Sequence, residues 1–185
     1  MANSQWLATA IEHARIIHAH DYPSHTGIDG KRAPQLKRLW WCCILRDATL
    51  SLGLRRPPHI SFKATSLRHS LFDLQDFREE IVASRVFDVS TKRIQVRLLS
   101  LFCALCWCML ESLEVLYPRW HKIRSSDSSA EHGQLQRRAF LDQCYRRLND
   151  WYQVAADSEA LAYSESSSND RSLIMFKNLI FMMYQ

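Results

Sequence analysis

Residues 36–60, LKRLWWCCILRDATLSLGLRRPPHI, place charged side chains inside an apolar helical pattern. Pro34 suits the first turn of a helix, where its missing N–H group is not needed. Gly53 suits the C′ position after the last turn, and Pro57 and Pro58 prevent the helix from continuing. The apolar side chains recur three and four residues apart, which predicts one buried helix face: Leu36, Leu39, Trp40, Cys43, Ile44 and Leu50.

Asp47 lies on this same face, so we expect its side chain to be buried. A buried carboxylate needs a hydrogen-bonding or charged partner. Arg55 and Arg56 follow the expected helix end, and either can fold back toward it, where a positive charge also complements the helix dipole. We therefore interpret Asp47 as one half of a structural ion pair that fixes the turn. A catalytic carboxylate would need a second titrating group nearby, and no obvious one is present in the sequence.

The composition of the chain indicates an all-α fold. Its 185 residues are 47% apolar, which is enough for a sizeable core, and they include only four glycines and five prolines. The net charge of +5, from 24 basic and 19 acidic residues, permits a negatively charged partner but does not require one. Basic pairs are scattered along the chain, so we predict a solvated helical surface and no nucleic-acid-binding block.

The most apolar run, LLSLFCALCWCML at 98–110, predicts a central helix buried by its neighbours. Its 13 residues rise about 20 Å, which is shorter than the hydrocarbon core of a bilayer, so we expect no membrane span. A cap at Ser90 or Thr91 should begin this helix, and Pro118 should end it. The N-terminus has no secretory signal, which favours an intracellular protein with reduced cysteines.

We expect further helices before and after this central one, at about 4–20, 74–82, 141–155 and 171–185. Residues 124–133 and 157–170 have the composition of flexible linkers. The last helix reaches Gln185 without a stop signal, so we interpret 1–185 as a partial domain that ends within a structural unit.

Three groups of residues invite a metal-binding interpretation, and we predict no metal site in any of them. Cys103, Cys106 and Cys108 lie on one apolar helix, from which they cannot complete a tetrahedral zinc site. On one continuous helix, the histidines at 13, 18 and 20 diverge. The acidic residues between Asp73 and Glu80 fit a solvated helix start, because no second acidic motif accompanies them. Catalytic motifs such as phosphate loops and nucleophile elbows are also absent from the sequence, so we predict no catalytic residue.

Two segments of the sequence resemble the regulatory region of fungal zinc binuclear cluster transcription factors, known as the fungal-specific transcription factor domain. That family has a Trp-Leu-x-x-Ala-x-x-x-Ala helix, an Arg-Arg-Leu-Trp-Trp motif, an Asp six residues after the second Trp and a Gly-Arg-Pro turn. Residues 76–93 resemble the relatives of the cutinase transcription factors in particular. The first motif falls on Trp6, Leu7, Ala10 and Ala14, and the others fall on Lys37 to Trp41, Asp47, and Arg56 with Pro57.

This sequence departs from the family pattern in two ways. Ala48 stands where the family has arginine, and Leu54 and Arg55 interrupt the Gly-Arg-Pro turn, which makes Arg56 the better partner for Asp47. The family binds DNA through a basic module in which six cysteines hold two zinc ions, and these 185 residues contain no such spacing. The structural family motif is therefore Trp40, Trp41, Asp47, Gly53, Arg56 and Pro57.

The resemblance implies a nuclear regulatory domain without enzymatic activity. It implies protein partners, such as a full-length relative, and a small-molecule effector, with DNA contacted only indirectly and no membrane. It also implies that zinc, the family's cofactor, belongs to the N-terminal module and that this chain has no cofactor of its own. The alternative interpretation is a helical small-molecule-binding protein or enzyme with a pocket beside the central helix.

Overall fold

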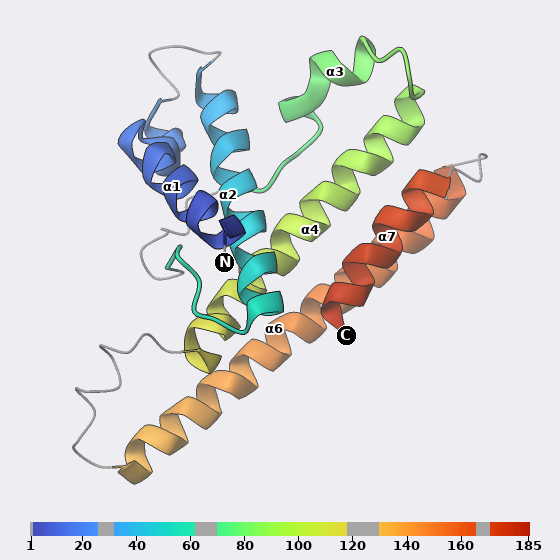
Figure 1. Ribbon diagram of the computed structural model, residues 1–185. Helices are drawn as coiled ribbons and strands as arrows, with labels where there is room; N and C mark the ends of the chain where they lie inside the picture. Colours follow the sequence, from blue (N-terminus) through green and yellow to red (C-terminus); the bar gives the residue numbers. More distant parts are fainter. Residues whose placement is uncertain (1, 26–31, 62–69, 118–129, 166–170) are drawn as a thin grey trace. The chain divides into compact units, whose positions relative to one another are not determined.

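The computed structural model describes residues 2–25, 32–61, 70–117, 130–165 and 171–185 (Figure 1). These residues form helices and no strands, so the all-α prediction is confirmed. In chain order the elements are α1 (Ala2–Ile16), η1 (Ala19–His25), α2 (Arg32–Leu54), η2 (Gln75–Phe77), α3 (Arg78–Val82), α4 (Val89–Leu116), α6 (Ala130–Glu165) and α7 (Arg171–Tyr184).

The chain divides into two compact units, and the long helices α4 and α6 each contribute to both. The first unit contains Met1–His69 and Cys106–Tyr145, and the second contains Ser70–Leu105 and Arg146–Gln185. Each unit therefore brings together segments that are distant in the sequence.

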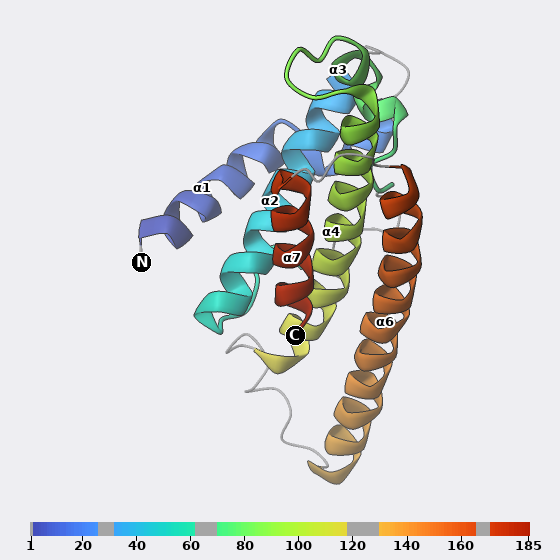
Figure 2. The ribbon, with the colours of Figure 1, turned by 90° about the vertical axis from the view of Figure 1, so that its right-hand side faces the viewer.

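In the first unit, α1 and η1 pack against the N-terminal part of α2, as both views of the ribbon show (Figures 1 and 2). The helix α1 buries Leu7, Ile11 and Ala14, which recur at the helical period. Trp40 and Trp41 of α2 are almost fully buried, and the Trp41 ring lies 6.3 Å from the ring of Trp107. Two large aromatic side chains thus anchor α2 in the core of this unit.

The end of α1 differs from the prediction. The helix stops at Ile16 instead of near His20, because His18 adopts a left-handed conformation with φ 58° and its N–H group donates to the Arg15 carbonyl. The turn brings the rings of His18 and His20 to 6.0 Å in a stacked pair. Our prediction that these two histidines diverge was wrong, since it assumed one continuous helix.

In the second unit, α7 packs on the C-terminal part of α6 through aromatic side chains. The Trp151 ring lies 6.0 Å from Phe181 and 5.6 Å from Tyr184, while Tyr152 stacks on Tyr184 at 5.0 Å. Trp151 Nε1 also donates to the Leu101 carbonyl of α4 at 2.9 Å. The predicted buried face of α6 is confirmed at Cys144, Trp151 and Ala155.

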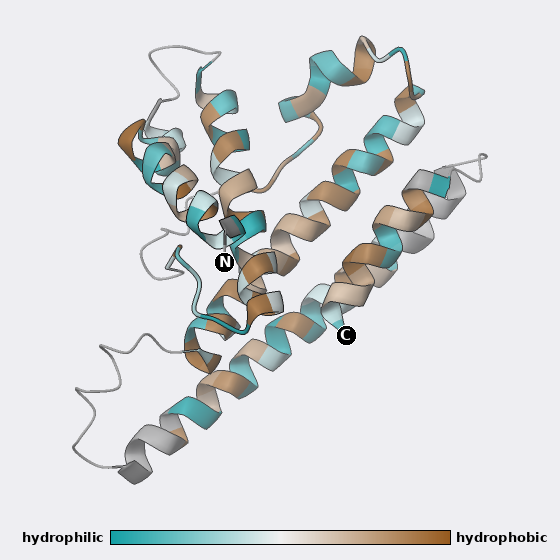
Figure 3. Cartoon of the chain, in the orientation of Figure 1, coloured by the Kyte–Doolittle hydropathy of each residue, from teal (hydrophilic) through white to brown (hydrophobic). Residues whose placement is uncertain are grey.

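The helix α4 is the most apolar long segment of the chain, as its brown colouring indicates (Figure 3). Its buried apolar residues recur mostly at the helical period: Ile94, Val96, Cys103, Leu105, Cys106, Met109, Leu110 and Leu113. The N-cap is Asp88, not Ser90 or Thr91, because its carboxylate accepts the N–H group of Thr91 at 2.8 Å. By length and composition alone, its 28 residues could also cross a bilayer, but buried side chains at this period are equally typical of a core helix.

The helix α6 is longer than the sequence predicted. It includes 130–133 and 157–165, which we had interpreted as parts of flexible linkers. Alanine, leucine and glutamate are strong helix formers, and they are frequent in VAADSEALA at 154–162. The remaining parts of the two linkers, 124–129 and 166–170, lie outside the described residues.

Candidate functional site

The candidate site forms at the C-terminal end of α2 and in the segment that follows it. The buried face of this helix carries Trp40, Ile44, Asp47 and Ser51, at spacings of four, three and four residues. Asp47 is 0% exposed, so a carboxylate lies within a mostly apolar helix face. Its burial requires that the folded chain supplies hydrogen bonds to both oxygens.

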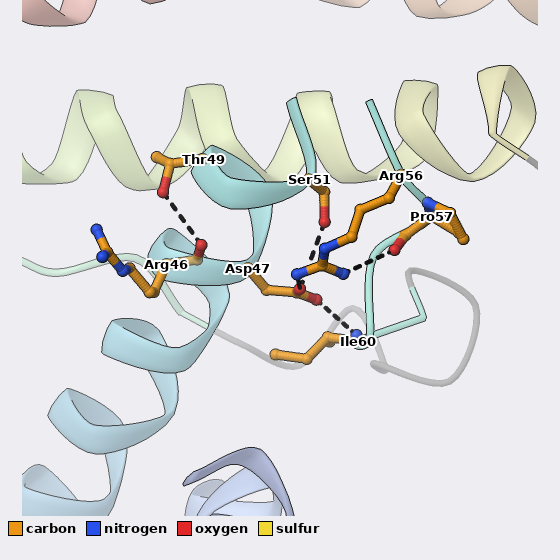
Figure 4. A network of polar contacts seen from close by, with 7 residues as sticks. All are labelled: Arg46, Asp47, Thr49, Ser51, Arg56, Pro57 and Ile60. Carbon is orange, nitrogen blue, oxygen red and sulfur yellow. Dashed lines mark hydrogen bonds and ion pairs between the residues drawn. The ribbon is translucent and has the colours of Figure 1, made fainter. Parts of the chain in front are cut away.

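The strongest of these bonds comes from the main chain. The N–H group of Ile60, itself buried, donates to Asp47 Oδ2 at 2.7 Å (Figure 4). Ser51 Oγ, one turn later on α2, donates to Oδ1 at a longer 3.4 Å. Asp47 therefore fastens the segment after α2 to the helix across 13 residues of sequence.

Arg56 is the arginine that approaches Asp47. Its Nη2 lies 3.5 Å from Asp47 Oδ1, and its Nη1 donates to the Pro57 carbonyl at 2.9 Å (Figure 4). The ion pair is long, while the bond from Ile60 is short, so the main-chain amide is the closer partner of the carboxylate. Arg55, the other arginine considered, is exposed.

The end of α2 corrects the role assigned to Gly53. The N–H groups of Arg55 and Arg56 donate to the carbonyls of Leu52 and Ser51, at 3.2 and 3.1 Å, which is the pattern of a Schellman motif. The C′ residue is thus Arg55, whose φ is 50°, whereas Gly53 lies within the helix. Gly53 has no atom within 4 Å of the position of a Cβ, so neither packing nor backbone conformation requires glycine there.

Burial dominates the electrostatics of Asp47. Desolvation raises its pKa, and the hydrogen bond from Ile60 and the charges of His59 and Arg56 oppose that rise only in part. The same surroundings raise the pKa of the Cys43 thiol to about 11, through burial first and then through the charges of Cys42 and Asp47. Cys43 is therefore an inert thiol at neutral pH, not a nucleophile.

The arrangement around Asp47 suits a structural role. The carboxylate is fully buried and both of its oxygens already accept hydrogen bonds, so no face of it is open to a substrate. Sequence reasoning missed Ile60, because any residue except proline can donate a main-chain hydrogen bond. The only signal was the apolar end of the stretch, at Pro58 and Ile60, both of which are buried.

Next to this network, α1 and the segment after α2 border a partly open cavity of about 430 Å³. Its walls combine apolar side chains with two arginines, one glutamate and one histidine. The lining residues are Ala8, Ile11, Glu12, Arg15, Arg56, Pro57, Pro58 and His59. Arg56 thus contacts both the cavity and the buried carboxylate.

The cysteines and acidic residues that we considered as metal ligands lie in the core or cap a turn. Cys103 and Cys106 are fully buried, and among the residues that the structure describes no group of three or more potential ligands could hold a metal ion. Asp73 and Asp76 cap the turn at η2, where Asp73 Oδ1 accepts the N–H group of Asp76 at 3.1 Å and Asp76 Oδ2 accepts that of Asp73 at 2.9 Å. That the chain has no cofactor of its own stays a prediction.

Comparisons with known proteins identify the family of this chain. The model of the fungal-specific transcription factor domain matches residues 2–153, which include both α1 and the Asp47 network. The chain belongs to this family. It is therefore a regulatory domain of a fungal transcription factor, and the resemblance carried by the Trp-Trp and Arg-Pro motifs is confirmed.

Two relatives agree with this assignment. Over 120 residues the chain is 28% identical to cutinase transcription factor 1 beta of Fusarium vanettenii. The aligned region covers 60% of this chain and 14% of that protein. Over 41 residues it is 46% identical to a transcription factor of Fusarium pseudograminearum (strain CS3096). That aligned region covers 20% of this chain and 4% of the relative. The chain thus spans a small part of the length of both relatives. No solved structure matches it.

Proposed function

We propose that this domain acts in the nucleus as a non-catalytic regulatory module that tunes a transcriptional activator through contacts with protein partners. A full-length relative is one such partner, and DNA is then contacted only through it. The family match over residues 2–153 carries the proposal. The fully buried Asp47 supports it, since the most distinctive polar network described in the chain stabilises a turn and presents no reactive group. Zinc would remain confined to the DNA-binding module of the partner.

A reporter experiment tests the regulatory role. The 185-residue chain is fused between a heterologous DNA-binding domain and an activation domain, and transcription from a matching promoter is compared with that of the fusion lacking the insert. We expect the insert to change the output at equal protein level. An Asp47→Ala insert, which weakens the fold, should change the output less. Equal output with and without the folded insert would contradict the proposal.

A binding experiment tests the indirect contact with DNA. The purified chain should bind duplex DNA weakly, without sequence preference and with an affinity that falls steeply with salt, because it has scattered arginines and no base-reading module. Tight, sequence-selective binding at physiological salt would show that the chain reads DNA itself.

The cavity favours a second, compatible function, which is binding of a small-molecule effector. A volume of about 430 Å³ lies within the range of small-ligand sites. The cavity is bordered by α1 and residues 56–59, so it differs from the pocket beside the central helix that the alternative interpretation expected. An effector that binds there would contact Arg56 and thereby the network at the end of α2.

A further inference from the structure

We propose that the cavity between α1 and residues 56–59 binds a small organic monocarboxylate with an apolar body, held by the guanidinium groups of Arg15 and Arg56. This inference rests on the proposed effector-binding function and assigns the ligand chemistry to a site. Nothing in the family match or in the names of the relatives specifies such a site.

The two walls of the cavity come from one helix face and one extended segment. On α1, the residues at 8, 11, 12 and 15 fall at positions i, i+3, i+4 and i+7, so they share one face. The segment 56–59 forms the other wall and is held in place by the hydrogen bond from Ile60 to Asp47. A wall fixed to the core by a 2.7 Å bond is well suited to a preformed site.

Arg56 keeps donors for a second anion. Its bond to Asp47 Oδ1 is long, at 3.5 Å, whereas the N–H group of Ile60 donates to Asp47 Oδ2 at 2.7 Å. Its other assigned bond is to a neutral acceptor, the Pro57 carbonyl. The Arg56 side chain is 19% exposed, so it is largely desolvated yet still reachable from the cavity. A guanidinium in this state binds a carboxylate more strongly than a fully solvated one.

The charges that line the cavity select the charge of the ligand. Arg15 and Arg56 contribute two positive charges, and Glu12, which pairs with Arg15 at 2.8 Å, contributes one negative charge. Asp47 is 0% exposed and cannot contact the ligand, but at 3.5 Å its charge offsets part of the Arg56 charge. Glu12, Arg15 and Arg56 together leave one excess positive charge, and the charge of His59, another lining residue, adds to it. That charge favours a monoanion, while Glu12 disfavours a second negative charge.

The remaining lining side chains select the body of the ligand. Ala8, Ile11, Pro57 and Pro58 present aliphatic surface, which favours an apolar chain or ring over a polar one. Because Arg56 contacts both the cavity and Asp47, a bound carboxylate should also stabilise the end of α2. Binding should therefore raise the melting temperature of the domain.

Three probes with the same body and different charges test this inference on the full 185-residue chain: 3-phenylpropionate, 3-phenylpropanamide and 3-phenylpropylammonium. We expect calorimetry or NMR titration to show saturable binding of the carboxylate at millimolar concentration. The neutral amide should bind about tenfold more weakly, because it cannot form charge-assisted hydrogen bonds with a guanidinium. Equal binding of the acid and the amide, or no binding of the acid, would overturn the inference.

Variants locate the binding site. Arg15→Gln, which removes a partly exposed charge at the cavity, should weaken 3-phenylpropionate about tenfold without unfolding the chain. Arg46→Gln is the matched control, because Arg46 is exposed on the same helix as Asp47 and does not line the cavity. Arg56→Gln should weaken binding as well, with the circular dichroism spectrum as a check of its fold. Equal losses in Arg15→Gln and Arg46→Gln would show general charge attraction and would contradict the site.

The reporter fusion separates the two proposals. If the insert regulates transcription but the chain does not bind 3-phenylpropionate, the regulatory function stands and the ligand site falls. If the carboxylate binds and Arg15→Gln weakens it, while the insert leaves the reporter unchanged, the site stands and the regulatory function falls.

Discussion

Asp47 and Asp88 are both carboxylates at helix ends, one at the C-terminal end of α2 and one at the start of α4, and their surroundings are opposite. Asp47 is 0% exposed and its closest donor is the amide of Ile60, 13 residues away. Asp88 is exposed, and its donors are Ser90 Oγ at 2.6 Å and the N–H and hydroxyl groups of Thr91 at 2.8 and 2.9 Å. Desolvation raises the pKa of Asp47, whereas hydrogen bonds to Ser90 and Thr91 lower the pKa of Asp88 to about 2.

The difference teaches where each carboxylate acts. Asp88 stabilises a local structure, the first turn of its own helix, because an N-cap carboxylate satisfies N–H groups that have no partner within the helix. Asp47 stabilises a long-range connection, since it holds the segment after α2 against the core of the first unit. Loss of Asp88 should therefore fray one helix end, and loss of Asp47 should destabilise a whole unit.

Asp47→Ala should have the largest effect. The change leaves the buried N–H group of Ile60 and the largely buried guanidinium of Arg56 without their acceptor, and it creates a cavity. We expect a loss of about 3 kcal/mol in the free energy of unfolding, which urea denaturation followed by circular dichroism can measure. The matched control is Asp47→Asn, whose amide oxygen can still accept from Ile60, so its loss should be smaller. An unchanged midpoint for Asp47→Ala would show that the carboxylate faces solvent in solution.

Asp88→Ala should have a smaller effect. The variant takes the side-chain acceptor away from the buried Thr91 N–H group, but water can occupy the place of the exposed Asp88 carboxylate. We expect a lower melting temperature in a thermal scan, with a decrease well below that of Asp47→Ala. Asp88→Asn should retain most of the stability, because asparagine is an equally good N-cap. A larger decrease for Asp88→Ala than for Asp47→Ala would reverse the comparison.

Arg55→Gly should stabilise the domain. Arg55 has φ 50° at the C′ position of α2, and a non-glycine residue there carries a steric cost that glycine avoids. We expect a gain of about 1 kcal/mol in the free energy of unfolding by urea denaturation. Gly53→Ala is the companion variant, and it should also be neutral or slightly stabilising, since Gly53 is helical with open space around it. A stability loss in Gly53→Ala would show that the position requires glycine after all.

The sequence predicted those parts of the fold that depend on local chemistry. The burial of Trp40 and Asp47 on α2 and the buried face of α6 follow from spacing, because helical neighbours recur every three to four residues. Leu39, which we expected on the buried face of α2, is 39% exposed. Position after the helix end left both Arg55 and Arg56 as partners of Asp47, and the comparison with the family motif favoured Arg56, which lies 3.5 Å from the carboxylate. These features need no knowledge of residues far along the chain.

The errors have a common physical cause. Gly53 has the residue type of a C′ position, but the helix continues for one more residue and Arg55 takes the left-handed conformation instead. Ile60 could not be found as the main donor to Asp47, because a main-chain amide leaves no mark in the residue type. The stacked pair of His18 and His20 depends on a turn after Ile16, which apolar periodicity did not reveal. Backbone conformation at helix ends, not side-chain chemistry, decided each of these cases.

The two carboxylates should also respond to pH with opposite signs. Since the folded pKa of Asp47 lies above the ordinary aspartate value of 3.8, the folded state binds a proton more readily than the unfolded state. Wild type should therefore gain stability relative to Asp47→Asn as the pH falls from 7 toward about 4.

The folded pKa of Asp88 is about 2, below the same ordinary value of 3.8. The contribution of Asp88 to stability is therefore complete above pH 3.8 and is lost as the pH falls through about 2. Melting temperatures of wild type, Asp47→Asn and Asp88→Asn, measured from pH 7 to about 2, test both signs. Parallel curves for wild type and Asp47→Asn would mean that the hydrogen bond from Ile60 and the nearby charges cancel desolvation. A loss of stability of wild type relative to Asp47→Asn in acid would mean that they outweigh it.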